Sequence, residues 1–498
     1  MTTKPAYEEL TRTYTRLHHY RHMQAMLAWD RNAMMPPAGS EARAAALAEL
    51  GALMHRTRTE PRLSRLVDAA EQESLDSFER ANLREIRRDL RRANAVPESL
   101  VVARTLAVSR CEHGWRRQRM ENDWQGFLAN FREVLKLARE QARLLAADSG
   151  LTPYDALLDR FEPGMRSAEL DRLFTDLRGW LPSLLAQVTE KQRNETVITP
   201  VGPFPREQQR ALNLQLMQLL GFDFEAGRLD ESIHPFNGGV PEDVRMTTRY
   251  HADDFLHSLM GTIHETGHAR YEQNLPRAWL DQPVGRARSF GIHESQSLAF
   301  EMQLARSPGF ARVLAPLLDE HLGHQPAFEP DNLARLLTRV RPGLIRVDAD
   351  ELTYPAHIIL RFEIERALIE GEIEAEDIPA MWNEKMQHLL GLDTRDNFRD
   401  GCLQDVHWPE GAFGYFPSYT LGAMYAAQWF AKLRREHPDL DTDIAAGRLQ
   451  PVLDWLHRHI WSCASRFETP ELTRRATGEA LNPAHFRNHL ETRYLAES

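Results

Sequence analysis

The sequence has few cysteines, and none of them is arranged as a pair. Its 498 residues include only Cys111, Cys402 and Cys463, and no CxxC spacing is present. An odd number of widely spaced cysteines argues against a disulfide framework and against a metal site built from cysteines. We therefore expect three free thiols.

Long apolar runs are also missing. With 42% hydrophobic and 27% charged residues, the sequence contains no window near the roughly 18 consecutive apolar residues of a membrane span. The first residues, MTTKPAYEELTRTYTRLHHY, show no basic stretch leading into an apolar segment, as a secretory signal would. These absences exclude a membrane-embedded protein and lead us to expect a cytoplasmic one.

The sequence shows no concentration of basic residues and no internal boundary. Its formal net charge is −11, with Lys and Arg scattered among acids, so no basic stripe is available for nucleic acid. No repeat of fixed period and no low-complexity linker divides the chain. We predict a single domain over residues 1–498, with a helical amino-terminal lobe over residues 1–165 and a catalytic lobe over residues 166–498.

What the sequence does contain is helical periodicity. Leu, Ala, Glu and Arg recur at amphipathic spacing between short Pro or Gly signals. The pattern predicts a mainly α fold, with helices over residues 40–56, 77–91, 130–147, 167–192 and 331–340.

One short segment departs from this pattern. Residues 243–250 alternate, with Val244, Met246, Thr248 and Tyr250 on one face, and they follow the turn-rich HPFNGGVPE. Alternation of period two predicts a β-strand. Such a strand either pairs with an extended peptide through main-chain hydrogen bonds or forms a small structural hairpin.

The motif HETGH lies within the predicted helix over residues 253–274. His264 and His268 are four residues apart, so their imidazoles lie about 40° apart on successive helical turns and can reach one cation. Glu265 lies just beside that line, where it can contact the attacking water without binding the metal itself. This arrangement meets the geometric requirements of zinc-dependent hydrolysis.

Zinc needs a third protein ligand and an open fourth position. The metzincin class places a glycine and a histidine where this chain has Tyr271 and Asn274, which excludes that class. A second predicted helix, over residues 291–307, offers acids seven apart and therefore on one face. Glu294 is our choice for the third ligand, and Glu301 and His293 are the alternatives.

Two further polar segments are candidates for the site. In IRVDAD, Arg346 is either part of a buried ion pair or an anchor for a substrate carboxylate. In the aromatic loop GCLQDVHWPEGAFGYFPSYTLG, His407 and Tyr419 are the donors best suited to an oxyanion, unless they are only hydrogen-bonding groups of the core.

Taken in order, the motifs HPF, DVRMT, HETGH, HESQ, IRVDAD and LQDVHW resemble the carboxypeptidase Taq family of metallocarboxypeptidases. The likeness extends to WDRNAMMPPAGSEAR near the start, to YDALLDRFEPGM, and to YFPSYTLGAMYAAQ near the end. It therefore covers nearly the whole chain.

The resemblance implies a helical fold like that of neurolysin and angiotensin-converting enzyme, with a deep groove around the metal and a small sheet beside it. It implies a homodimer that acts on short peptides. The spacing of the motif does not distinguish Zn²⁺ from Co²⁺, because both accept the same nitrogen and oxygen ligands. The residue roles that it implies are His264, His268 and Glu294 as ligands, Glu265 as general base, His407 and Tyr419 toward the oxyanion, and Arg245 and Arg346 lining the groove for the substrate.

The chain departs from the family after HESQS. Where the family commonly continues RLWEN, residues 298–302 read LAFEM, so a cation and an amide are lost and Phe300 replaces an indole. The change puts the surroundings of the ligands in question rather than the ligand set. It makes a catalytically weak, peptide-binding homologue one alternative to the enzyme.

A second alternative is a di-iron oxidoreductase. HETGH contains ExxH, and a second ExxH runs from Glu231 to His234, the pattern of di-iron helical bundles. The second pair runs directly into Pro235 and Gly238, which end helices. We therefore favour hydrolysis of the carboxy-terminal peptide bond of short peptides.

Overall fold

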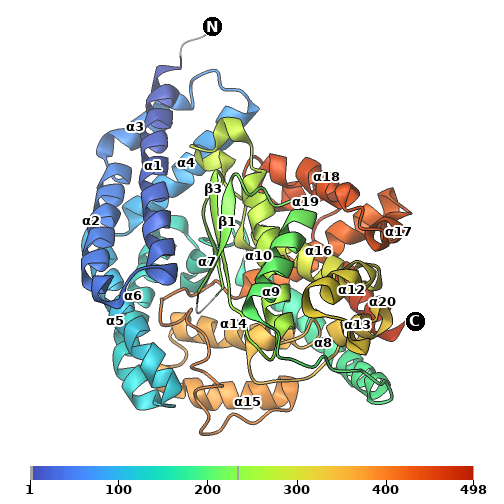
Figure 1. The fold of residues 1–498 in the computed structure, drawn as a ribbon. Coiled ribbons are helices and arrows are strands. Elements are labelled where there is room, and N and C mark those ends of the chain that lie inside the picture. The colour runs from blue at the N-terminus through green and yellow to red at the C-terminus, as the bar shows by residue number, and fades with distance from the viewer. Residues whose placement is uncertain (1–3, 233–234, 497–498) are drawn as a thin grey trace.

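The computed structural model describes residues 4–232 and 235–496 and confirms the mainly helical class (Figure 1). No helix in these ranges is both long and apolar enough to cross a membrane. All three cysteines are free, as expected. The α-helices are α1 (Pro5–Ala33), α2 (Ser40–Arg58), α3 (Pro61–Ala70), α4 (Ser77–Ala95), α5 (Glu98–Met120), α6 (Trp124–Ser149), α7 (Pro153–Leu158), α8 (Ser167–Arg193), α9 (Arg206–Leu219), α10 (Phe255–Gln273), α11 (Phe290–Leu298), α12 (Pro308–Leu322), α13 (Pro330–Leu337), α14 (Tyr354–Glu370), α15 (Ile378–Leu390), α16 (Pro417–Glu436), α17 (Leu440–Ala445), α18 (Gln450–His459), α19 (Thr469–Thr477) and α20 (Ala484–Leu495).

The five predicted helices correspond to α2, α4, α6, α8 and α13. Local capping explains the sharp start of α4, because the Asp76 side chain accepts hydrogen bonds from the amides of Phe78 and Glu79, and the Asp76 amide donates one to the Glu79 side chain. Helix α13 ends three residues before the predicted boundary. Helix ends are the least certain feature of a periodic pattern.

The buried apolar side chains form one large cluster and a separate one on the first helices. The separate cluster joins α1 to α4 through fully buried residues such as Leu10, Tyr14, Leu63 and Ile86. The large cluster begins at Val96 and extends to the carboxy-terminal helix. The division into two lobes at residue 165 stays a prediction.

A three-stranded sheet lies between the first helices and α10. Its order is β1 (Gly227–Glu231), β3 (Asp243–Thr248) and β2 (Asn237–Val240), with β1 parallel and β2 antiparallel to β3. Helix α1 contacts β2, and α10 contacts β2 and β3 from the other side (Figure 1). The sheet thus links the amino-terminal helices to the helix that carries HETGH.

The strand predicted from alternation is β3, which is two residues shorter than expected. Val244 and Met246 are fully buried, as their shared face required. Because β3 pairs on both sides, it offers no free edge to a peptide, and the β2–β3 hairpin alternative is confirmed. The di-iron alternative needs Glu231 on a helix, but Glu231 is the last residue of strand β1. His234 lies outside the described residues.

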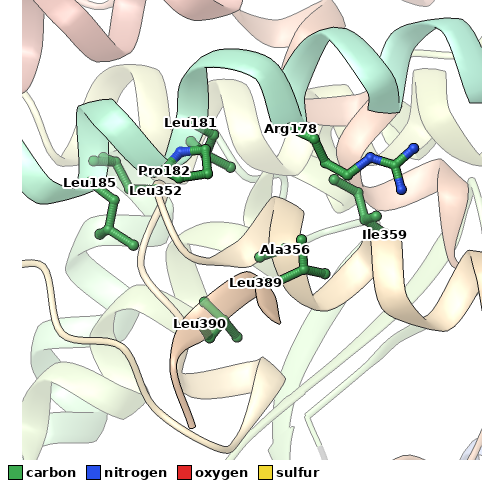
Figure 2. Close-up of a pocket in the computed structure, with 9 residues that line it drawn as sticks. All are labelled: Arg178, Leu181, Pro182, Leu185, Leu352, Ala356, Ile359, Leu389 and Leu390. Carbon is green, nitrogen blue, oxygen red and sulfur yellow. The ribbon is translucent and has the colours of Figure 1, made fainter. Parts of the chain in front are cut away.

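Figure 2 shows a small apolar cavity where α8, α14 and α15 meet. Its volume is about 10 Å³, which is close to the space for one water molecule. Leucine side chains from α8 and α15 face it, together with Pro182, which lies inside α8. The cavity is a packing gap and has no room for a ligand.

Candidate functional site

Helix α10 presents the two histidines of HETGH to one side. Asp254 caps the helix by accepting hydrogen bonds from the amides of Leu256 and His257. The predicted apolar stripe is buried. His264 and His268 therefore project from successive turns, with ring centroids 5.0 Å apart. The members of the stripe are Phe255, Leu259 and Ile263.

Glycine in HETGH allows the next helix to approach. A Cβ on Gly267 would lie 2.5 Å from the carbonyl oxygen of Gln296 and 2.6 Å from the Cα of Ser297. A Cβ on Gly422 of α16 would likewise lie 2.6 Å from the Cγ of Glu294. The two glycines let α10 and α16 close on α11.

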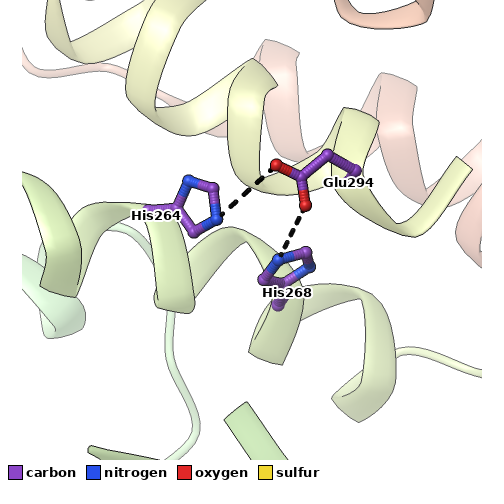
Figure 3. Close-up of side chains that lie close together, drawn as sticks. All are labelled: His264, His268 and Glu294. Atoms are coloured by element: carbon purple, nitrogen blue, oxygen red, sulfur yellow. Dashed lines mark ion pairs between the residues drawn. The ribbon is translucent and has the colours of Figure 1, made fainter. Parts of the chain in front are cut away.

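This packing brings the carboxylate of Glu294 to both imidazoles, as Figure 3 shows. Its Oε1 lies 3.8 Å from Nε2 of His264, and its Oε2 lies 3.4 Å from Nε2 of His268. Ligand atoms of the three residues all lie within 4.8 Å of one another. Two ring nitrogens and one carboxylate form a donor set that suits a divalent metal with an open position.

The two alternative ligands bind the outer nitrogens of the histidines instead. Oε2 of Glu301 lies 2.8 Å from Nδ1 of His264, and its Oε1 accepts a hydrogen bond from Arg306 at 2.9 Å. Nδ1 of His293 lies 2.6 Å from Nδ1 of His268. Outer partners of this kind fix the orientation of ligating imidazoles, so the residues present fit a bound metal.

The charges around the two histidines differ. Burial alone would lower the pKa of His264, but the Glu294 and Glu301 carboxylates outweigh it and raise the pKa to about 10. Burial lowers the pKa of His268 to about 4, and the neighbouring His293 and His264 act in the same direction. Burial also raises the pKa of Glu265 to about 7, where it is poised to exchange protons.

His407 and Tyr419 lie together, as the sequence suggested. Nε2 of His407 is 3.0 Å from the hydroxyl of Tyr419, which lies on α16 one turn before Gly422. Burial lowers the pKa of His407 to about 3 and holds that of Tyr419 well above its ordinary value. Both side chains are therefore neutral groups that can donate hydrogen bonds.

The guanidinium of Arg346 lies beneath this pair. It is 4.8 Å from the ring centroid of Tyr419, and its Nε and Nη2 donate to Oδ1 of Asp405 at 2.9 and 2.8 Å. Arg361 donates to the other oxygen of Asp405 at 2.7 Å. These contacts are those of a buried ion pair, one of the two alternatives for Arg346.

Arg245 lies apart from this cluster, on β3. Its Nη2 donates to Oδ2 of Asp243 at 2.8 Å, and its guanidinium carbon lies 4.7 Å from the ring centroid of Trp29 on α1. The structure therefore places the two predicted substrate arginines in different surroundings, one against α1 and one beneath Tyr419.

The LAFEM departure falls in a π-helical segment, η4 (Ala299–Ala305), that continues α11. Phe300 is fully buried, and Leu298 is 7% exposed. Burial explains why apolar side chains are stable here. The wider turn still presents Glu301 to His264, so the outer hydrogen bond is retained.

Three contributors to this arrangement were missed at the level of sequence. Glu272 binds Nε2 of His293 at 2.9 Å, Arg306 binds Glu301, and Asp405 joins the two arginines. Glu272 is four residues after His268, so helical spacing could have found it. Arg306 and Asp405 carry no comparable local signal.

Comparison with known proteins agrees with this geometry. Residues 9–494 match the carboxypeptidase Taq (M32) metallopeptidase family. The chain is 41% identical to thermostable carboxypeptidase 1 of Thermus thermophilus, over 100% of this chain and 99% of that protein. It is 35% identical to carboxypeptidase 1 of Bacillus subtilis, over 96% of each.

A solved structure gives the same result. Metallocarboxypeptidase 1 of Trypanosoma cruzi superposes with a TM-score of 0.96 at 50% sequence identity, over 99% of this chain and 100% of that one. The likeness thus extends over the whole fold, including the helices that carry the histidines and Glu294. The chain belongs to the carboxypeptidase Taq (M32) family of metallopeptidases.

Proposed function

We propose that the protein is a metal-dependent carboxypeptidase that hydrolyses the last peptide bond of short peptides. The observation that carries the proposal is the convergence of His264, His268 and Glu294 on one point, with Glu265 beside them. Family membership supports the reaction class, since the relatives of T. thermophilus and B. subtilis are named carboxypeptidases.

His264, His268 and Glu294 would hold Zn²⁺, and Co²⁺ accepts the same nitrogen and oxygen donors. When bound, such a metal lowers the pKa of water and polarises the scissile carbonyl. Glu301 and His293 keep the two imidazoles oriented through their outer nitrogens. The chain itself thus supplies a fixed site that needs little rearrangement.

Glu265 is the general base in this proposal. It takes a proton from the attacking water and passes it to the leaving amine, a role that suits a carboxyl with a pKa of about 7. His407 and Tyr419 donate hydrogen bonds to the oxyanion, and each such donor is typically worth about 3–4 kcal/mol. No covalent intermediate is required.

Arg346 supports Tyr419 from below, and Asp405 fixes its position. Several expectations stay predictions: that Arg245 and Arg346 anchor the substrate carboxylate, that the groove is deep, that the protein is a homodimer and that it is cytoplasmic. They rest on the family resemblance and on composition.

A digest of a short amino-blocked peptide, with and without a chelator, tests the proposal. We expect release of single residues from the carboxy terminus that stops when the metal is removed. Internal cleavage would change the assignment to an endopeptidase, and no cleavage by metal-loaded protein would favour the peptide-binding alternative. One zinc per chain supports the peptidase, whereas two irons would support the oxidoreductase.

Glu265→Gln separates metal binding from turnover. We expect the variant to keep its metal and to lose turnover by about 10²- to 10⁴-fold, because the proton acceptor is gone. Glu384→Gln, at an exposed position on α15, is the matched control. Full activity of the metal-loaded Glu265 variant would refute the role of this residue.

A further inference from the structure

A second cavity, away from the histidines, lies between α4 and the segment that leads into α19. Its volume is about 360 Å³, within the range of small-molecule sites. Segments nearly 400 residues apart in sequence form its walls. The lining residues are Ser77, Arg80, Ala81, Arg84, Arg466, Phe467, Glu471 and Arg475.

The cavity is strongly positive. Its lining side chains include four arginines and one glutamate, in a chain whose formal net charge is −11. That acid, Glu471, is already paired with Arg475 at 2.9 Å. Glu85, which pairs with Arg84, is shared with the buried Arg288. Gathering like charges is unfavourable, and a bound anion would offset this cost.

The guanidinium groups are held in place rather than left free in solvent. The guanidinium carbon of Arg466 lies 4.4 Å from the ring centroid of Phe78, and its Nη2 donates to the hydroxyl of Ser77 at 3.0 Å. Arg475 lies over Phe467 at 4.2 Å. Stacking on aromatic faces fixes a guanidinium plane and lowers the entropy lost when it binds a ligand.

Donors remain available on these fixed groups. Within residues 4–232 and 235–496, Nε and Nη1 of Arg466 have no hydrogen-bond partner. In the same part of the chain, Arg80 uses only Nη1, which donates to the carbonyl of Leu75. Planar guanidinium forks with free N–H groups match the oxygens of phosphate in pairs.

We propose that this cavity binds a small polyanion that carries phosphate groups, of about the size of pyrophosphate. The anion is held by Arg466 and Arg80, with Arg475 at the rim. Because α4 belongs to the separate amino-terminal cluster and α19 packs on α16, the bound anion joins the first helices to the body of the protein. It stabilises the folded chain by binding it preferentially.

Calorimetric titration of the metal-loaded protein with pyrophosphate tests the proposal. Wild type, Arg466→Gln and Arg474→Gln are compared at one ionic strength; Arg474 is an exposed neighbour on α19 that does not line the cavity. We expect one saturable site per chain, binding about tenfold or more weaker in Arg466→Gln, and wild-type binding in Arg474→Gln. A binding heat that is the same in all three proteins would come from pyrophosphate bound at the metal site.

Two further arms strengthen the test. Arg80→Gln changes an exposed side chain, so it should fold even if Arg466→Gln does not, and it too should bind more weakly. Inorganic phosphate and a nucleoside triphosphate distinguish a single phosphate group from a longer ligand. Equal binding by all variants, or no saturable binding by wild type, would overturn the proposal.

Discussion

The helix formed by α11 and η4 carries both Glu294 and Glu301, and its two ends are fixed by different chemistry. At the amino-terminal end, the buried carboxylate of Glu162 accepts hydrogen bonds from the amide of Gly291 and, at 2.7 Å, from the hydroxyl of Ser418. These donors are uncharged. Burial accordingly raises the pKa of Glu162 to about 7.

At the carboxy-terminal end, the buried carboxylate is paired with an arginine. Glu351 accepts from Arg493 at 3.1 Å and from Tyr494 at 2.8 Å, and it lies 2.9 Å from Nε2 of His489. Burial alone would raise its pKa, but Arg493 and His489 hold the pKa well below its ordinary value.

The same helix is thus anchored at one end by a carboxylate with uncharged hydrogen-bond donors and at the other end by a carboxylate paired with an arginine. Arg493 also donates to the carbonyls of Met302 and Gln303 in η4, next to Glu301. The charged end therefore leads directly to the outer partner of His264. The uncharged end instead makes stability sensitive to pH near neutrality.

Removing the charge at the carboxy-terminal end should have the largest effect. Glu351→Gln leaves the buried Arg493 without its carboxylate partner, and we expect the free energy of unfolding to fall by about 3–5 kcal/mol. Denaturant unfolding at pH 7 measures it, with Glu384→Gln, at an exposed site, expected to change stability by less than about 0.5 kcal/mol. A loss in Glu351→Gln no larger than that in Glu384→Gln would contradict charge compensation at this end.

The amino-terminal end predicts a pH dependence. The folded pKa of Glu162, about 7, exceeds its ordinary value of 4.5, so its stabilising contribution is complete below pH 4.5 and is lost as pH rises through 7. We expect wild type to lose on the order of 3 kcal/mol relative to Glu162→Gln between pH 4.5 and 8. Unfolding curves of both proteins across this range measure the difference, and parallel curves would contradict the assignment.

The sequence identified the elements of the site better than their connections. His264, Glu265 and His268 follow from helical geometry alone, and β3 follows from alternation. Glu294 and Glu301 were correctly placed on one face, and both carboxylates indeed lie near His264. Which one approaches the inner nitrogen depends on how α10 crosses α11.

That crossing is tertiary information. It is set by the close approach at Gly267 and by the π-helical turn after Leu298, neither of which has a periodic signature. Glu162 and Glu351 are more distant still, because each comes from a loop far from the helix that it anchors. Long-range pairs of this kind cannot be inferred from the spacing of residues in one sequence.

The outer partners of the histidines allow a sharper comparison. Glu301 contacts the ring of His264 directly, whereas Glu272 reaches His268 only through His293. We expect Glu301→Gln to weaken metal binding by about 10- to 100-fold and Glu272→Gln by clearly less. Competition with a chromogenic chelator measures both affinities. If the two losses of metal affinity are equal, direct contact of the carboxylate with the ligand ring does not determine the affinity.

The smallest effect on metal affinity is expected where the charged end meets η4, although Arg493→Met also removes the partner of Glu351 and should lower stability. Arg493→Met removes the donors to the Met302 and Gln303 carbonyls while keeping the apolar stem, so Glu301 is held less firmly. We expect metal affinity to fall severalfold, less than in Glu301→Gln, and the double variant to lose less than the sum of the two, because both changes act through one carboxylate. Arg487→Met, at an exposed position on α20, is the control. Additive losses would mean that Arg493 stabilises the fold without orienting Glu301.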